Sequence, residues 1–467
     1  MKKLGIDYKE NLSILERELR VKDSFDVLCK KILIGKQEAA IYFIDGFIKD
    51  TVMQKLMMHM MSAKNVGNSA REFMRVSIPY VETDVTDDLE LMVQMVMSGT
   101  AVMIADGFGD EAVIIDARTY PARQTEEPEG DRVMRGPRDG FVETLIFNTA
   151  LVRRRIRNPS LTMEYYTVGS DSRTDVVLSF MADRVDMKYV ELLRKKLGSL
   201  KCTSLTMGHE SLVEMLIPNK WYNPFPKVRT TERPDSAASQ LLEGSVLILI
   251  DNSPQVLVLP STIFDFMQES NDFYFPPLTG TYIKLVRYSV FFLTLVLIPL
   301  WYLGTLYPEL VPTWLSFSLP EETGKLPLIA QLFLAEFIID ALRLASLNTP
   351  NMLNNSLSVV GGLILGDFAV GIGWLIPEVI LYMAFVAIAN FTQRSYELGY
   401  AIKFLRLLLL ALTALFRAWG FIGGLVLCII LLLANSTLNG KRNYVYPLIP
   451  FNFKALKSLV VRTKKKM

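Results

Sequence analysis

The sequence predicts an α/β cytoplasmic region of two subdomains, followed by a polytopic α-helical membrane domain. Composition supports this prediction: of 467 residues, 51% are hydrophobic and only 21% charged, and the mean hydropathy is +0.28. These averages conceal a contrast along the chain. Apolar runs with short breaks fill residues 285–435, whereas the preceding part has the mixed composition of a soluble protein.

The chain divides at changes in composition. We expect a charged helical lead-in (1–24), a first α/β subdomain (25–120), a linker (121–140), a second α/β subdomain (141–284), a membrane domain of four to five helices (285–435) and a basic tail (436–467). The linker is rich in Pro, Gly and charged residues, which is typical of a boundary between compact parts.

Helical and strand patterns alternate in both subdomains. In the first, residues 38–47 read as a strand ending in an Asp-Gly turn, and residues 101–117 as a hairpin around Asp106 to Gly109. In the second, residues 141–157 read as a helix and residues 245–260 as another hairpin. An α/β fold is the simplest architecture for such a pattern.

The predicted helix over residues 141–157 ends in four arginines: Arg153, Arg154, Arg155 and Arg157. Cations near a helix C-terminus meet the negative end of the helix dipole, so a structural role needs no partner. The alternative is that they contact anionic lipid headgroups or the carboxylates of a neighbouring subunit. We take them as candidate subunit contacts, together with Glu232, Arg233 and Asp235 in a Pro-fixed segment.

Five apolar runs follow in the predicted membrane domain: residues 289–304, 326–347, 357–375, 376–391 and 405–434. The second run carries Glu336, Asp340 and Arg343, so whether it spans the membrane stays open. These three residues fall at i, i+4 and i+7, hence on one helical face, and exposing that face to lipid would cost several kcal/mol.

Two interpretations of that face stay open. Copies of the helix around an oligomer axis could form a ring of carboxylates that lines a cation path, with Glu336 and Asp340 as candidate residues. Alternatively, Arg343 neutralises Asp340 and the helix lies at the membrane surface. Asp367 is a further candidate for the ion path. It follows Gly362 and Gly366, whose spacing permits close packing of helices.

Charge bias leaves the membrane topology open. Arg394, Lys403 and Arg406 precede the last apolar run and a basic tail follows it, so both flanks favour the cytoplasmic side. A single span cannot satisfy both. Either the run folds back near Arg417 and Gly420, or one basic flank is translocated or interfacial.

Several functional classes lack support in the sequence. We find no Walker A loop, GxGxxG after a strand, GxSxG or HExxH pattern, and the two histidines lie far apart, so we expect no enzyme activity. Three scattered cysteines give neither zinc spacing nor a disulfide framework, and we expect no cofactor or metal. A net charge of +2 without a basic stripe argues against nucleic acid as a partner. The charged N-terminus is unlike a signal peptide, which predicts a cytoplasmic N-terminal region.

Four motifs make the sequence resemble a known family. They are PRDGFVETLIFNTALVRRRIRNP (137–159), NPFPKVRTTERPD (223–235), LLEGSVLILIDNSPQVLVLP (241–260) and RSYELGYAIKFLR (394–406). The chain resembles the GerA family, the A subunits of bacterial endospore germinant receptors and their relatives, from about residue 25 to the C-terminus. Four further motifs, at residues 280–288, 324–328, 376–382 and 446–456, are similar to a relative that accompanies the receptors rather than to their nutrient-selective subunits.

The resemblance implies a function and partners. Family members look like oligomeric channels or channel subunits of the spore inner membrane, which work when ions and dipicolinic acid leave the core at germination. It implies a homo-oligomer, a multi-span membrane partner subunit and association with germinant receptor proteins. The alternatives are a ligand-sensing A subunit of a nutrient germinant receptor and a non-conducting scaffold for germination proteins.

Overall fold

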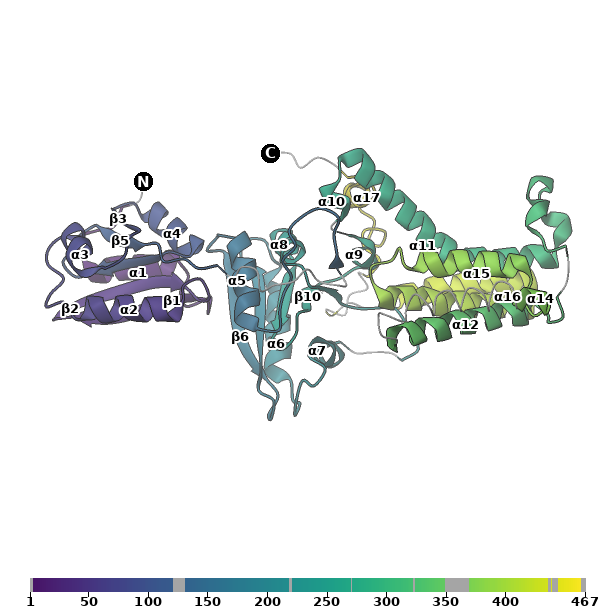
Figure 1. The fold of residues 1–467 in the computed structure, drawn as a ribbon, viewed down its shortest axis with the longest axis horizontal. Helices are drawn as coiled ribbons and strands as arrows, with labels where there is room; N and C mark the ends of the chain where they lie inside the picture. Colours follow the sequence, from purple (N-terminus) through teal and green to yellow (C-terminus); the bar gives the residue numbers. More distant parts are fainter. Residues whose placement is uncertain are drawn as a thin grey trace. The chain divides into compact units, whose positions relative to one another are not determined.

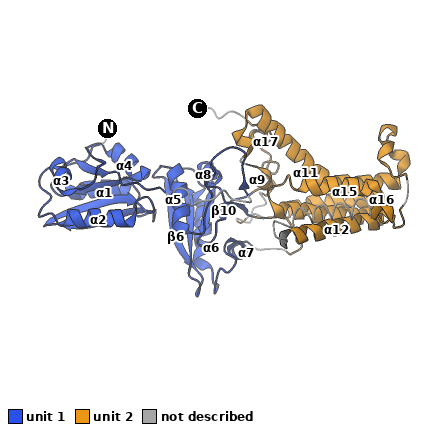
Figure 2. Cartoon of the chain, viewed as in Figure 1, with its two compact units in different colours: residues 1–218, 228–261 blue, residues 219–227, 262–467 orange. Residues whose placement is uncertain are grey.

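The structure is a computed structural model that describes residues 3–120, 131–217, 221–269, 271–321, 324–348, 369–435, 438 and 444–462. The chain forms two compact units (Figure 2). Unit 1 comprises Met1–Pro218 and Val228–Ser261, and unit 2 comprises Asn219–Lys227 and Thr262–Met467.

The first half of unit 1 is a five-stranded sheet with helices on both faces (Figure 1). Its elements are α1 (Tyr8–Glu18), β1 (Val27–Ile34), β2 (Gln37–Ile44), α2 (Asp50–Met61), α3 (Ala70–Ser77), β3 (Thr83–Thr86), α4 (Leu89–Ser98), β4 (Ala101–Ala105) and β5 (Ala112–Ile115). The strand order is β1-β2-β4-β5-β3, and every pair is antiparallel. Gly99 ends α4 with φ 97°, a left-handed conformation that favours glycine.

The second half of unit 1 repeats this architecture. Its elements are α5 (Leu145–Arg155), β6 (Leu161–Val168), β7 (Thr174–Met181), α6 (Met187–Ser199), α7 (His209–Leu216), β8 (Arg229–Thr231), α8 (Pro234–Leu242), β9 (Val246–Ile250) and β10 (Val256–Leu259). The strand order β6-β7-β9-β10-β8 is again all antiparallel. Unit 1 therefore contains two copies of one helix and strand sequence, and Gly244, with φ 95°, matches Gly99.

Side-chain alternation explains how each sheet is covered. Ala40 and Tyr42 of β2 join the core that holds α1 and α4, whereas Ala39 and Ile41 join the core that holds α2 and α3. In the second sheet, α5 and α8 share a core with Val177 and Met181, and α6 lies over Phe180 on the opposite face. Both faces are buried, so the central strands read as continuous apolar runs.

The expected N-terminal region of mixed helices and strands is confirmed, and both of its sheets are antiparallel and contain hairpins. One segment enters the core against its composition. Residues 221–235 are polar and contain three prolines, which is unlike a core element. Instead, β8 pairs with β10, and the side chain of Arg233 is completely buried.

Unit 2 is a bundle of helices. Its elements are α9 (Ile263–Met267), α10 (Asn271–Tyr274), α11 (Pro277–Leu306), the short 3-10 helices η2 (Pro308–Leu310) and η3 (Thr313–Ser318), α12 (Leu328–Asn348), α14 (Ala369–Gly371), α15 (Pro377–Asn390), α16 (Tyr396–Leu433) and α17 (Phe453–Val460). The long helix α11 packs against α15 and α16, and α12 packs against α15.

The 38-residue helix α16 is a helical hairpin. At Arg417 the backbone has φ 55° and ψ −132°, which interrupts the helix. Leu409 and Gly424 are fifteen residues apart, about 22 Å in a straight helix, yet a Cβ on Gly424 would lie 2.5 Å from Leu409 Cδ1. Residues 418–433 therefore fold back along residues 396–416. Of the two topologies that the basic residues on either side of this run allowed, the structure has the one in which the run folds back near Arg417.

Two helices among the described residues are long and apolar enough to cross a membrane, α11 and α16, and the break at Arg417 divides α16 into two shorter arms. Helix α12 has 21 residues but carries three charged side chains, and α15 has only 14 residues. The predicted run over residues 357–375 lies mostly outside the described residues. The expectation of a polytopic domain with four to five spans stays a prediction.

The hairpin predicts that Gly420 tolerates no side chain. A Cβ at this position would overlap the carbonyl oxygen of Leu412 in the opposite arm, so Gly420→Ala should lower the free energy of unfolding of unit 2 by about 1–3 kcal/mol. Tryptophan fluorescence during denaturation in detergent reports this, because all five tryptophans lie in unit 2. Gly423→Ala is the matched control, since nothing lies within 4 Å of the point that its Cβ would occupy. Equal stability of the two variants would contradict the hairpin.

Candidate functional site

A cluster of four charged side chains joins α12 to the first arm of α16 inside unit 2. Both carboxylate oxygens of Glu336 accept hydrogen bonds from Arg406 Nη2, at 2.8 and 2.7 Å. Lys403 Nζ lies 3.5 Å from Glu336 Oε1 and also pairs with Asp340. Glu336, Lys403 and Arg406 are buried, and Asp340 is half-buried. We call these four residues the charge cluster.

The helical periods of the two elements create this cluster. Glu336 and Asp340 are four residues apart on α12, and Lys403 and Arg406 are three residues apart on α16, so each pair faces one side of its helix. Arg406 Nη1 also donates to the carbonyl oxygen of Thr294 in α11, at 3.3 Å. Thr294 lies five residues into the apolar run of α11, or about 8 Å along the helix.

The cluster balances two negative charges with two positive charges. Moving an unpaired charge out of water costs several kcal/mol, and mutual attraction offsets that cost only when partners and hydrogen bonds are well placed. Arg406 meets this requirement, because its Nη2 donates to both oxygens of Glu336 and its Nη1 donates to Thr294. The apolar helices of unit 2 can therefore enclose these side chains in a neutral arrangement.

The sequence pattern identified the acids but not their partners. Arg343 does not neutralise Asp340: its guanidinium lies over the rings of Phe391 and Tyr400, at 5.1 and 5.9 Å from their centroids. Lys403 was assigned to a basic flank, whereas α16 begins earlier, at Tyr396, and includes it. The complementary spacing of acids and bases was the signal that could have revealed the pairing. Candidate residues Asp367, Gly362 and Gly366 lie outside the described residues.

Arg153 connects the two halves of unit 1. It is completely buried, and its Nε and Nη2 atoms donate to Asp26 at 2.7 and 3.0 Å. Nη1 donates to the carbonyl oxygen of Asn158, and Nη2 donates to that of Leu161. The guanidinium of Arg153 is thus fully engaged by groups of its own chain. Arg153 is therefore not available as a subunit contact in the described arrangement.

The other candidate contact residues differ in exposure. Arg154 and Arg157 are exposed, whereas Arg155 Nη2 donates to both carboxylate oxygens of Asp139, at 2.7 and 2.6 Å. Arg233 is buried and pairs with Asp235, and Glu232 accepts a hydrogen bond from Gln255 at 3.1 Å. Arg154 and Arg157 are thus the arginines of this group whose charge reaches solvent.

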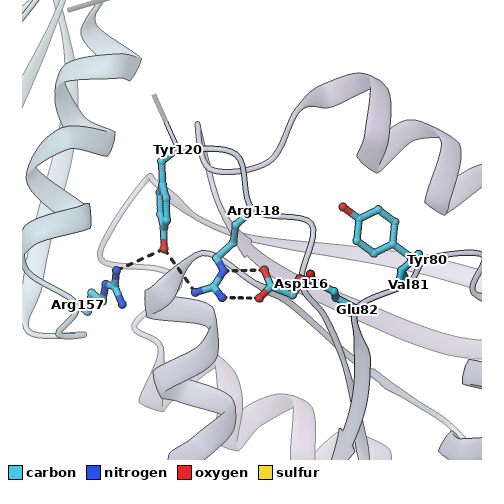
Figure 3. Close-up of a pocket in the computed structure, with 7 residues that line it drawn as sticks. All are labelled: Tyr80, Val81, Glu82, Asp116, Arg118, Tyr120 and Arg157. Atoms are coloured by element: carbon cyan, nitrogen blue, oxygen red, sulfur yellow. Dashed lines mark hydrogen bonds and ion pairs between the residues drawn. The ribbon is translucent and has the colours of Figure 1, made fainter. Parts of the chain in front are cut away.

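An open cleft of about 650 Å³ lies in unit 1 beside these arginines (Figure 3). Its lining residues are Tyr80, Val81, Glu82, Asp116, Arg118, Tyr120 and Arg157. Figure 3 shows a chain of contacts from Arg157 through the Tyr120 hydroxyl to Arg118 and Asp116. Hydrogen bonding to Asp116 raises the pKa of Arg118. The cleft offers charges of both signs and a phenol, but these residues gave no recognisable motif in the sequence.

Similarity to known proteins decides the family. A model of the Bacillus/Clostridium GerA spore germination protein family matches residues 14–467. The chain belongs to the GerA family. It is therefore a spore germination protein of that family, as the four motifs indicate.

Curated relatives match this GerA-family chain over nearly its whole length. Stage V sporulation protein AF of Bacillus subtilis (strain 168) is 37% identical over 445 residues, covering 95% of this chain and 90% of the relative. It is the relative that the four further motifs resemble. Spore germination protein KA of the same organism is 28% identical, covering 96% of this chain and 84% of the relative. The uncharacterized membrane protein YfkQ, also from this organism, is 30% identical, covering 97% and 88%.

One solved structure is also similar. The N-terminal domain of the A subunit of the Bacillus megaterium spore germinant receptor GerK3 has 26% sequence identity and a TM-score of 0.42, and the match covers 56% of this chain and 98% of that domain.

The charge cluster predicts strong energetic coupling between Glu336 and Arg406. Either Glu336→Gln or Arg406→Gln should lower the free energy of unfolding of unit 2 by about 3–5 kcal/mol, because each leaves a buried charge without its partner. The double variant should lose less than the sum of the two single variants. Denaturation followed by tryptophan fluorescence measures all three. Glu309→Gln, an exposed acid in η2, should change little, and additive losses would contradict the pairing.

Proposed function

We propose that this GerA-family protein is an oligomeric subunit of an ion channel in the spore inner membrane, which supports the release of ions or dipicolinic acid at germination. In this proposal the N-terminal unit lies in the cytoplasm, and the chain is not an enzyme. The single observation that carries the proposal is the charge cluster. Ionisable side chains enclosed by apolar helices are expensive to keep, and in membrane proteins they commonly mark ion pathways.

Stability alone does not explain these four side chains. Replacing a buried ion pair by apolar residues of similar volume is often neutral or stabilising, so a packing role would not require them. Each carboxylate of the charge cluster is paired with a cation of the same chain, which neutralises the charge that would attract a passing ion. We therefore interpret the described arrangement as a closed state. Moving α12 away from α16 would free Glu336 and Asp340, and copies around an oligomer axis would then present a ring of carboxylates.

The proposal includes partners. The chain would assemble with copies of itself and with a multi-span membrane subunit, and it would act beside germinant receptor proteins. The names of the relatives support the setting, since they are spore germination and sporulation proteins.

Ion flux tests the proposal directly. The rate of cation flux is measured across proteoliposomes that hold the protein, with and without the membrane partner subunit. The wild type is compared with the variant Glu336→Gln plus Asp340→Asn. The proposal expects the variant to change the rate or the cation selectivity of flux by tenfold or more, on the order expected for losing about 1.4 kcal/mol of ion stabilisation.

The matched control is Glu309→Gln, which removes an exposed carboxylate from the same unit and should leave flux unchanged. Unchanged flux in the cluster variant would move the ion path elsewhere, with Asp367 as the next candidate. Absence of flux in every preparation would sink the channel proposal.

Oligomer formation is tested through the exposed arginines of α5 and the residues after it. Arg154→Glu plus Arg157→Glu should reduce the particle mass in mild detergent to that of a single chain, because the charge reversal would repel an acidic surface on the neighbouring copy. Mass photometry measures this. Lys188→Glu plus Lys195→Glu on α6 makes the same change of charge at exposed positions and serves as control. An unchanged mass would remove these arginines from the interface.

Two alternatives have observations in their favour. The cleft beside Arg118 and Tyr120 favours a ligand-sensing A subunit, because its mixed charges suit a small zwitterionic molecule. The neutrality of the charge cluster favours a non-conducting scaffold, in which the acids are only structural. The flux experiment separates the scaffold from the channel.

A further inference from the structure

The segment over residues 446–461 exposes several large apolar side chains. Its large hydrophobic side chains at the surface include two phenylalanines, Phe451 and Phe453, each 68% exposed. The others are Tyr446, Leu448, Ile449 and Val461. A surface of this size on one short segment indicates contact with another apolar phase.

Both ends of this segment are fixed near the start of the apolar run of α11. Tyr444 and Val445 belong to the core that includes Tyr288, Phe291 and Leu295. At the other end, the carbonyl oxygen of Leu459 accepts a hydrogen bond from Lys284, and the backbone N–H of Arg462 donates to Thr281 at 3.1 Å.

These contacts fix the depth of the segment relative to the apolar run of α11. Thr281 and Lys284 precede Ser289, where the apolar run begins, by eight and five residues, or about 12 and 8 Å along the helix. The interfacial layers of a bilayer are about 5–8 Å thick on each side of the hydrocarbon core. If α11 crosses a membrane, Tyr444 and Val445 therefore lie at the boundary between headgroups and hydrocarbon, and the segment runs from there outward through the headgroup layer to Arg462.

The backbone of the segment suits that boundary. The N–H of Leu448 donates to the carbonyl oxygen of Val445, and the N–H of Asn452 donates to that of Pro447, both at 2.9 Å. The helix α17 then continues the chain, with Asn452 as its N-cap. The N–H of Ile449 also donates to Val445, and these internal bonds lower the cost of placing the turn at an apolar layer.

The charged side chains of the segment indicate which class of lipid it would bind. The outward side of α17 carries Lys454 and Lys457 beside Phe453. Residues 444–467 contain six cations, Lys454, Lys457, Arg462, Lys464, Lys465 and Lys466, and no Asp or Glu. Two copies of such a surface would repel each other, whereas phosphate-bearing lipids would attract it.

We propose that residues 446–461 form an interfacial anchor that inserts Phe451 and Phe453 below the headgroups of anionic lipids, with Lys454 and Lys457 at the level of the phosphates. The proposal rests on the membrane placement of α11 that the proposed function assumes. It adds a specific lipid-binding surface to a part of the chain distant in sequence from the charge cluster.

Spin-label accessibility in the full-length protein tests the anchor. Cys29, Cys202 and Cys428 are first replaced, and a nitroxide is attached at Phe453→Cys. Leu293→Cys, in the apolar run of α11, is the membrane reference, and Lys188→Cys on α6 is the aqueous reference. Accessibility to oxygen and to a water-soluble nickel chelate is measured in bilayers of phosphatidylcholine, with and without phosphatidylglycerol.

We expect the oxygen-to-nickel ratio at position 453 to fall between the two references with phosphatidylglycerol present, and to drop toward the aqueous reference in its absence. Lys454→Ser plus Lys457→Ser should abolish this dependence on lipid charge. A ratio equal to the aqueous reference in both bilayers would overturn the anchor. Low accessibility to both reagents would also overturn it, by showing that protein covers the segment. An interfacial ratio independent of lipid charge would overturn the assignment of anionic lipid.

The reference at position 293 separates this inference from the proposed function. If its label behaves as in a membrane while that at position 453 does not, only the anchor fails. If the label at position 293 is as accessible to nickel as that at position 188, the membrane placement fails, and both proposals fall with it.

Discussion

The need to neutralise buried charge governs the arrangement of unit 2. Glu336 and Asp340 lie in a helix that is otherwise mostly apolar, and no packing of that helix is favourable unless two cations reach them. Lys403 and Arg406 meet this need from α16, and Arg406 extends the contact to α11 through Thr294. The same requirement therefore fixes which faces of three helices meet. A change in their packing must either keep these contacts or supply new partners for the acids.

Unit 1 is built from two halves with the same architecture. Each of its halves is a helix followed by two strands, two helices, a strand, a helix and two strands, with the same order of strands in the sheet. Gly99 and Gly244 end equivalent helices and precede equivalent hairpins. The two halves are therefore structural repeats of one arrangement. Arg153 then joins the copies by bonding to Asp26, which belongs to the other half.

Local patterns in the sequence predicted several elements of unit 1. The hairpin of β4 and β5 lies within residues 101–117 and that of β9 and β10 within residues 245–260, because hairpins depend on short-range turn preferences. Contacts between residues that are distant in the sequence were harder to predict. Lys403 and Arg406 read as a basic flank, since nothing in their neighbourhood reveals the acids some 70 residues away. The strand β8 was missed because its three residues carry no apolar alternation and pair only through the sheet.

The hairpin of α16 has a consequence for the topology of the chain. Its two arms run in opposite directions, so the residues just before the first arm and those just after the second emerge at the same end of the bundle. If unit 2 lies in a membrane as proposed, the chain therefore leaves α16 on the same side of the bilayer from which it enters, and no further span is needed to return it there.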